Sequence, residues 1–155
     1  MFKIGVISDT HGFLDPEVPT LFAGVDHILH AGDVGSLDVL VELRALAPVT
    51  AVLGNVDYTE MGLRLTECVE LDGKKFLLHH IVNPRQLGEH LRASIAELQP
   101  DVVVFGHSHI PFQQKVGGVL FLNPGYAGRP RFNQPRSLVV AHLDERGLRC
   151  EFVPL

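Results

Sequence analysis

The chain has 155 residues, of which 46% are hydrophobic and 20% are charged, and this balance is typical of one soluble globular domain covering residues 1–155. Thirteen basic and eighteen acidic residues give a net charge of −5, which argues against stable binding to nucleic acid through phosphate neutralisation. No apolar stretch has the length of a membrane span, and the N-terminal residues do not form a secretory signal. We therefore expect a cytoplasmic protein without a membrane partner.

Short apolar runs rich in β-branched residues recur along the chain and are predicted to be strands. Five of them end in polar residues, and they cover Phe2–Ile7, Asp26–His30, Val49–Leu53, Phe76–Leu78 and Val102–Phe105. Two helices are expected between these runs. Ser36 is a suitable N-cap for a helix over Leu37–Ala47, and Asn83 followed by Pro84 predicts the start of a helix that ends before Pro100.

The other predicted strands form antiparallel pairs around turn sequences. Asp72-Gly73 is a type I′ hairpin signal, and Gly117-Gly118 and Glu145-Arg146-Gly147 separate two further pairs of apolar runs. Strands that alternate with helices, followed by hairpins, indicate an α/β domain with mixed sheets that stack on one another.

Polar residues follow five of the predicted strands directly. In chain order they are Asp9, Asp33, Asn55, His79 and His107. Functional groups in an open α/β sheet gather beyond the carboxyl ends of the strands, so we expect these side chains to meet at one edge. Asp9 and His107 are each followed two residues later by a histidine, His11 and His109. Alternate residues of an extended segment point the same way, so each pair is expected to present two ligands together.

This set contains oxygen and imidazole donors but no thiolate, which suits Mn, Ni, Fe, Co or Zn. Its seven donors exceed the four of one tetrahedral zinc ion, and a shared carboxylate could bridge two ions. A single Asp or His at a strand end is commonly a cap or a surface residue. Seven such residues, each after an apolar run, are difficult to explain in that way.

Taken in order, these motifs resemble the calcineurin-like metallophosphoesterase superfamily. The matching segments are Asp9-Thr10-His11, Gly32-Asp33, Gly54-Asn55-Val56-Asp57, His79 and Gly106-His107-Ser108-His109. The short chain, the Gly-Asn-x-Asp form and the later Asn123-Pro124-Gly125 resemble the small YfcE-type phosphodiesterases of that superfamily. The resemblance extends from Asp9 to about Arg131. It implies a four-layer sandwich, in which two stacked mixed β-sheets are flanked by helices.

The resemblance also implies roles for individual residues and a binuclear centre of two divalent transition-metal ions. One ion would be held by Asp9, His11 and His109, and the other by Asn55, His79 and His107. Asp33 would bridge the two ions, and Asp33 and Asn55 would lie at the reacting centre. The implied reaction is in-line attack of a metal-bound hydroxide on the phosphorus of a small phosphodiester or nucleotide substrate.

Three positions differ from the superfamily pattern or leave alternatives open. Val56 stands where many members have a histidine that protonates the leaving group, so that acid is absent. His80 stands where glycine is usual, and it is either a substitute acid or a polar residue at the rim. Arg131 either binds a substrate phosphate bidentately or is a surface arginine.

Two supporting residues are also predicted near the site. His30 is interpreted as a buried group close to the ligands and not as a ligand. Asp57 either accepts hydrogen bonds from a ligand or its neighbouring backbone, or caps a turn.

Other function classes remain open at this point. A non-catalytic scaffold that binds partner proteins is one alternative, because the retromer scaffold subunit resembles this fold; the complete ligand set disfavours it. A phosphomonoesterase or phosphoprotein phosphatase is another, and Val56 disfavours it. A homo-oligomer is compatible with the sequence.

Overall fold

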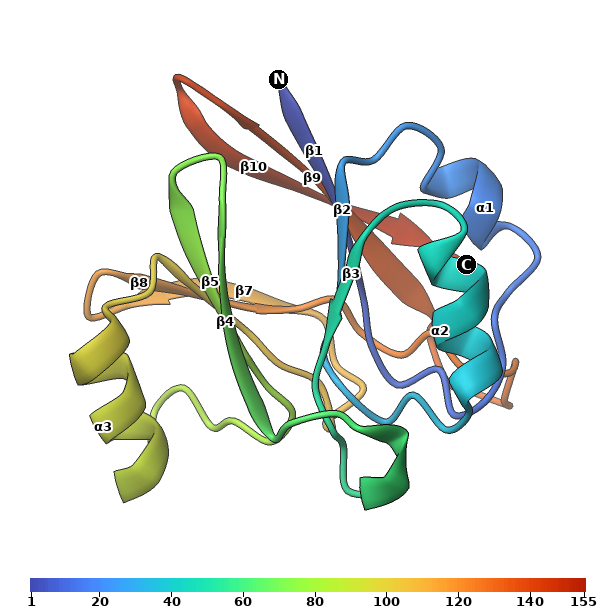
Figure 1. The fold of residues 1–155 in the computed structure, drawn as a ribbon, viewed down its shortest axis with the longest axis horizontal. Coiled ribbons are helices and arrows are strands. Elements are labelled where there is room, and N and C mark those ends of the chain that lie inside the picture. The colour runs from blue at the N-terminus through green and yellow to red at the C-terminus, as the bar shows by residue number, and fades with distance from the viewer.

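Ten strands form two five-stranded sheets in the computed structural model, which describes residues 1–155 (Figure 1). The first sheet contains, in spatial order, β10 (Gly147–Pro154), β9 (Ser137–Asp144), β1 (Phe2–Ile7), β2 (His27–His30) and β3 (Val49–Ala51). The second contains β4 (Thr66–Leu71), β5 (Lys74–His79), β6 (Val102–Val104), β8 (Val119–Asn123) and β7 (Phe112–Val116).

Both sheets are mixed, with three parallel strands and antiparallel strands at one edge or both. In the first sheet, β1, β2 and β3 are parallel, and β9 pairs antiparallel with both β1 and β10. In the second, β5, β6 and β8 are parallel, and β4 and β7 pair antiparallel at the two edges. The predicted α/β class with stacked mixed sheets is confirmed.

Helices cover the outer faces of the two sheets. The short α1 (Val18–Leu21) and α2 (Leu37–Arg44) pack on the first sheet, and α3 (Glu89–Leu98) packs on the second (Figure 1). A 3₁₀ turn, η1 (Thr59–Met61), lies in the connection from β3 to β4. None of these helices has the length and apolar character needed to cross a bilayer.

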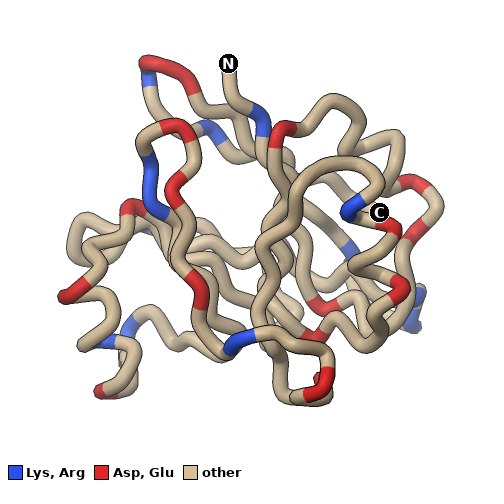
Figure 2. The backbone as a smooth tube through the Cα atoms, in the orientation of Figure 1, with Lys and Arg blue, Asp and Glu red and all other residues tan.

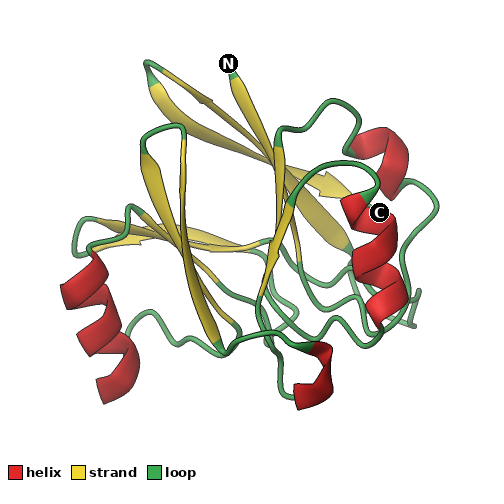
Figure 3. Ribbon diagram, in the orientation of Figure 1, coloured by secondary structure: helices red, strands yellow, loops and turns green.

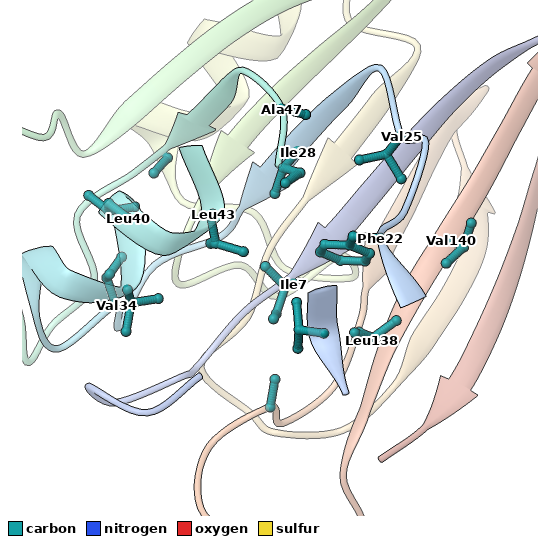
Figure 4. Packing of buried hydrophobic residues seen from close by; sticks show 14 residues of the cluster. Ile7, Phe22, Val25, Ile28, Val34, Leu40, Leu43, Ala47, Leu138 and Val140 are labelled. Atoms are coloured by element: carbon teal, nitrogen blue, oxygen red, sulfur yellow. The ribbon is translucent and has the colours of Figure 1, made fainter. Parts of the chain in front are cut away.

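Alternation along the strands produces three apolar layers. Val6 of β1 packs between the two sheets, whereas the next residue, Ile7, packs under α1 and α2. Figure 4 shows this outer cluster, in which Phe22 and Leu43 meet Ile7. Successive strand residues point to opposite faces, so strands buried on both sides read as continuous apolar runs.

The predicted helix after Asn83 begins later than expected. Asn83 Oδ1 accepts a hydrogen bond from Arg85 N, and the Asn83 carbonyl accepts one from Gln86 N, so these residues close a turn. Gly88 then has an extended backbone, with φ −65° and ψ 158°, and it is the N-cap of α3. An Asn side chain that accepts a hydrogen bond from the backbone N–H two residues later can either cap a helix or close a turn. At Asn83 it closes a turn, so the helix does not begin there.

The loops that follow the parallel strands gather at one end of the sandwich (Figure 3). Acidic and basic residues are interspersed over the chain and not separated into faces (Figure 2).

Candidate metal centre

Six predicted site residues lie in loops that directly follow β1, β2, β3 and β6. Their order along the chain is Asp9, His11, Asp33, Asn55, His107 and His109. The predicted convergence at the carboxyl ends of the strands is what the structure has, because these strands are parallel within each sheet.

The backbone at five of these residues is left-handed. The φ angles are positive at Asp9 (57°), His11 (50°), Asp33 (53°), His107 (68°) and His109 (63°). The expectation that Asp9-Thr10-His11 and His107-Ser108-His109 are extended is therefore wrong, since tight turns present each pair. Such conformations cost about 1 kcal/mol or more each in a side-chain-bearing residue, and they cluster at functional sites.

The first group of converging atoms belongs to Asp9, His11 and His109, whose ligand atoms all lie within 4.8 Å of one another. Asp9 Oδ1 is 3.3 Å from His109 Nε2 and 3.8 Å from His11 Nε2. Asp9 Oδ1 and His11 Nε2 are both buried and have no hydrogen-bond partner. Buried polar atoms without partners are costly, so their convergence fits a bound cation.

The other oxygen of Asp9 is held in place by the protein. Oδ2 accepts hydrogen bonds from Ser8 Oγ (2.8 Å) and from His107 N (3.1 Å), which leaves Oδ1 pointing into the group. Burial raises the pKa of Asp9, although Ser8 and nearby histidines oppose the rise. Burial also lowers the pKa of His109, which favours the neutral imidazole that binds metals.

The second group contains Asp33, His80 and His107, again within 4.8 Å. Asp33 Oδ2 lies 3.1 Å from His80 Nε2, and His107 Nδ1 lies 3.0 Å from Asn55 Oδ1. Burial opposes ionisation of Asp33, but His80 and the Val56 N–H outweigh it and lower the pKa of Asp33. This carboxylate is therefore charged at neutral pH.

His80 has the tautomer that a ligand needs. Its Nδ1 lies 2.7 Å from the Ala31 carbonyl oxygen, which only accepts, so Nδ1 carries the proton. Its Nε2 is buried without a hydrogen-bond partner and faces Asp33 and Asp9. An imidazole that donates to a carbonyl and directs its other nitrogen at carboxylates has the arrangement of a metal ligand. His80 is 3% exposed, so it does not fit a polar rim residue.

His79, which the resemblance implies as a ligand, is in neither group of converging atoms. Leu78 packs between the sheets, whereas Leu77 packs with Leu91 of α3. Because strand residues alternate, His80 continues the inner face and His79 the outer one. His79 Nδ1 accordingly pairs with Thr66 Oγ1 of β4 at 2.8 Å. Because the two histidines are adjacent and identical, the sequence does not indicate which of them faces inward.

Two glycines allow the ligand loops to approach closely. A Cβ on Gly54 would overlap the backbone nitrogen and carboxylate of Asp33, and a Cβ on Gly106 would overlap Ser8 Oγ and lie 2.5 Å from Asp9 Oδ2. The Gly-Asn and Gly-His motifs therefore place backbone directly against the two aspartates.

Asp57 joins the loops after β2 and β3. Its carboxylate accepts hydrogen bonds from Val34 N (3.1 Å), Gly35 N (2.8 Å) and Gly54 N (2.8 Å). Of the two sequence interpretations, hydrogen bonding to neighbouring backbone is the one that the structure has. This carboxylate fixes Asp33 and Gly54 relative to each other.

His30 joins the loops after β1 and β2. Its Nδ1 accepts from Gly32 N at 3.2 Å, so Nε2 carries the proton and donates to Thr10 Oγ1 at 3.0 Å. Thr10 Oγ1 then donates to the Val34 carbonyl at 2.9 Å. His30 is fully buried, and burial lowers its pKa to about 3, with His80 adding to the effect. The predicted supporting role of His30 is confirmed.

The remaining predicted residues lie at the open side of the site. Val56 is 46% exposed, and its N–H donates to Asp33 Oδ1 at 3.0 Å. Arg131 is exposed and lies over the ring of buried Tyr126, 4.9 Å from its centroid. Tyr126 is 4.7 Å from the His109 ring, centroid to centroid. Through Tyr126, Arg131 therefore lies near the first group. It forms no ion pair with a carboxylate.

An α/β sandwich with two groups of carboxylate and imidazole ligands at its strand ends defines a metal-dependent hydrolase centre. The model of the calcineurin-like phosphoesterase superfamily domain matches residues 2–146, and the chain belongs to this family. It is a metal-dependent phosphoester hydrolase.

Comparisons with individual proteins agree with this assignment. A probable metallophosphoesterase of Methanothermobacter thermautotrophicus is 38% identical over 97% of this chain and 91% of its own length. The phosphodiesterase YfcE of Escherichia coli is 29% identical over 88% and 85%. The structure also resembles wild-type Vps29 of Entamoeba histolytica complexed with zinc, with a TM-score of 0.74, 27% identity and 99% of both chains covered.

The placement of the adjacent histidines predicts different outcomes for two matched variants. His80→Ala should hold fewer metal ions per chain than the unchanged protein, because it removes an inward-facing nitrogen. His79→Ala should hold the full number, because His79 pairs with Thr66. Elemental analysis after dialysis at equal free Mn²⁺ makes the comparison, with circular dichroism as the control for folding. Loss of metal from His79→Ala alone would reverse the assignment.

The buried His30 predicts a pH-dependent difference in stability. Because its pKa falls from 6.5 to about 3 on folding, the unfolded chain binds the proton first as the pH drops, and each pH unit below about 6.5 costs about 1.4 kcal/mol of folding free energy. His30→Gln cannot titrate, so its destabilisation relative to the unchanged protein should shrink by about 2 kcal/mol between pH 7.5 and pH 5. Urea unfolding of both metal-free proteins measures this difference, and an equal penalty at both pH values would contradict it.

Proposed function

We propose that this protein is a phosphodiesterase that acts with two divalent transition-metal ions, from Mn, Ni, Fe, Co or Zn. The observation that carries the proposal is the position of Asp33 between the two ligand groups. Its Oδ2 is 3.1 Å from His80 Nε2 in the second group and 3.7 Å from His11 Nε2 in the first. A carboxylate that faces both groups suits a bridging ligand of a two-metal site.

The proposed ligand set differs from the expected one at a single position. One ion would be held by Asp9, His11 and His109, and the other by Asn55, His80 and His107, with Asp33 shared. His80 takes the place expected for His79. Every ligand is an imidazole nitrogen, an amide oxygen or a carboxylate oxygen, which suits the metals named.

Bound ions would supply a hydroxide nucleophile near neutral pH and would neutralise phosphoryl oxygens. The chain's own residues fix the geometry of this site. Ser8 and the His107 N–H orient Asp9, and the Val56 N–H orients Asp33. Asn55 and His107 are exposed, so the substrate reaches the site from solvent.

A preference for esters with stable leaving groups, such as phenolates, follows from the side chain at position 56. Val56 is exposed beside Asp33 and has no proton to donate to a leaving alkoxide. His80, the other candidate acid, has its Nδ1 bound to the Ala31 carbonyl and its Nε2 among carboxylates, which favours ligation over proton transfer to a leaving group. Arg131 is proposed to meet the phosphate from the side of His109, where it is exposed.

A scaffold function is the second candidate, and the likeness to Vps29 is the observation that favours it. The buried, partnerless ligand atoms favour hydrolysis instead, because a protein-binding surface gains nothing from Asp9 Oδ1 and His80 Nε2 facing inward.

Removal of metal should abolish hydrolysis. Chelation followed by dialysis is expected to reduce turnover of bis(p-nitrophenyl) phosphate to the background rate, and added Mn²⁺ should restore it, because both groups consist of carboxylate and imidazole donors and the nearby Ser8 hydroxyl is fully buried and donates to Asp9. Elemental analysis of the same samples is the control. Full turnover in protein proven free of metal would contradict the proposal.

Val56 should control the choice between diester and monoester. Without an acid, phenolates leave more readily than alkoxides, and a positioned acid is typically worth about 10²–10⁴-fold for the latter. Both test esters release p-nitrophenolate, but the monoester carries a second negative charge on its phosphate, so the unchanged protein should cleave bis(p-nitrophenyl) phosphate with a higher kcat/KM than p-nitrophenyl phosphate. Val56→His should raise monoester hydrolysis, while Val56→Leu, which adds bulk but no proton, should not. A monoester preference in the unchanged protein would overturn the diesterase assignment.

A further inference from the structure

A hollow of about 140 Å³ opens beside the proposed second metal site. It is lined by Leu53, Gly54, Asn55, Leu65, His79, His80 and Ile81. Asn55 and His80 belong to the proposed ligand set, so a group in this hollow lies next to the bound phosphate. None of the lining residues is acidic or basic apart from the two histidines.

A second hollow of about 340 Å³ continues from the first. The two share Leu65, His79 and Ile81, and the second extends to Gly88 and His90 at the start of α3. Figure 1 shows the connecting segment that runs from the end of β5 to α3 along this side. The two hollows form one groove, which we call the β5–α3 groove, and its larger part has the size of a small-molecule pocket.

The groove has apolar walls with polar groups between them. Leu65 is 62% exposed and Ile81 is 52% exposed, and both line each hollow. Polar contacts are available from Asn83 and His90, Thr66 and His79 pair with each other, and the larger hollow has no Asp, Glu, Lys or Arg in its lining. An alkyl chain would leave these polar atoms unpaired, and a second phosphate would find no cation.

An uncharged ring with a polar edge matches this lining. Its faces would cover Leu65 and Ile81, which removes apolar surface from water. Its edge would meet Asn83 and His90, whose side chains line the end of the groove away from the metal site. A nucleoside has these properties, and its ester oxygen would place the phosphate at Asn55.

We propose that the β5–α3 groove binds the nucleoside part of a nucleotide phosphodiester, and that Leu65 and Ile81 determine this specificity. The inference rests on the proposed phosphodiesterase function. It adds a subsite for the nucleoside, in which the apolar walls come from Leu65 and Ile81 outside the proposed ligand set.

Two substrates with the same leaving group test the proposal. They are the p-nitrophenyl ester of thymidine 5′-phosphate and methyl p-nitrophenyl phosphate, assayed with the Mn²⁺-loaded protein. We expect kcat/KM for the thymidine ester to be higher by about tenfold or more, mainly through KM. Leu65→Ser and Ile81→Ser should each reduce this ratio severalfold and leave the rate with the methyl ester unchanged.

Val41→Ser is the matched control, because Val41 is also 62% exposed but lies on α2, away from the groove. Its substrate ratio should equal that of the unchanged protein. Titration calorimetry with thymidine 5′-phosphate and methyl phosphate gives a readout without turnover, and the groove variants should weaken only the first.

The possible outcomes distinguish failure of nucleoside binding in the groove from failure of the proposed phosphodiesterase activity. A ratio near one in the unchanged protein, or an undiminished ratio in both groove variants, would refute nucleoside binding in the groove while hydrolysis of the methyl ester stands. If neither ester is cleaved, the proposed function fails, and calorimetry still decides the groove: equal affinity for both phosphates refutes it.

Discussion

Burial of two carboxylates among imidazoles is the constraint on which the rest of this structure depends. Asp9 is fully buried and Asp33 nearly so, and Asp9 Oδ1 has no hydrogen-bond partner. Burial raises the pKa of Asp9, whereas contacts with His80 and the Val56 N–H lower that of Asp33. An arrangement of this kind is costly without a compensating charge, and a pair of divalent cations is the compensation that its donor atoms fit. The protein therefore holds these side chains rigidly in place before any ion binds.

That rigidity comes from the loops and not from the strands that precede them. Left-handed backbone at Asp9 and Asp33 turns each chain sharply after a parallel strand, at an energetic cost that the surrounding contacts must offset. Asp57 ties the loops after β2 and β3 together through three backbone N–H groups, and His30 ties the loops after β1 and β2 through Thr10. Gly54 lets the backbone after β3 lie against Asp33. Each device fixes a carboxylate without using the oxygen that would bind metal.

The surroundings of the centre determine what it can act on. On one side Val56 leaves the leaving group without an acid, and on another the β5–α3 groove offers apolar walls at Leu65 and Ile81. His79 lines this groove because β5 directs it away from the ligands. Two adjacent histidines thus face two different environments, one among the proposed metal ligands and one in the groove proposed for the substrate. The alternation of side chains along β5 places His80 by the proposed metal centre and His79 in the β5–α3 groove.

The sequence by itself determined the strand pattern, the α/β class and most of the residues that converge in the two groups, because apolar runs and the polar residues after them are local features. Only the tertiary structure decided which of His79 and His80 faces the two groups, since this depends on which face of β5 packs against the first sheet. It also decided that the ligand pairs sit on left-handed turns and that α3 begins at Glu89 and not near Pro84. These outcomes depend on contacts between residues far apart in the chain, or on competition between two local hydrogen-bonded turns. Neither leaves a distinct pattern in the order of the amino acids.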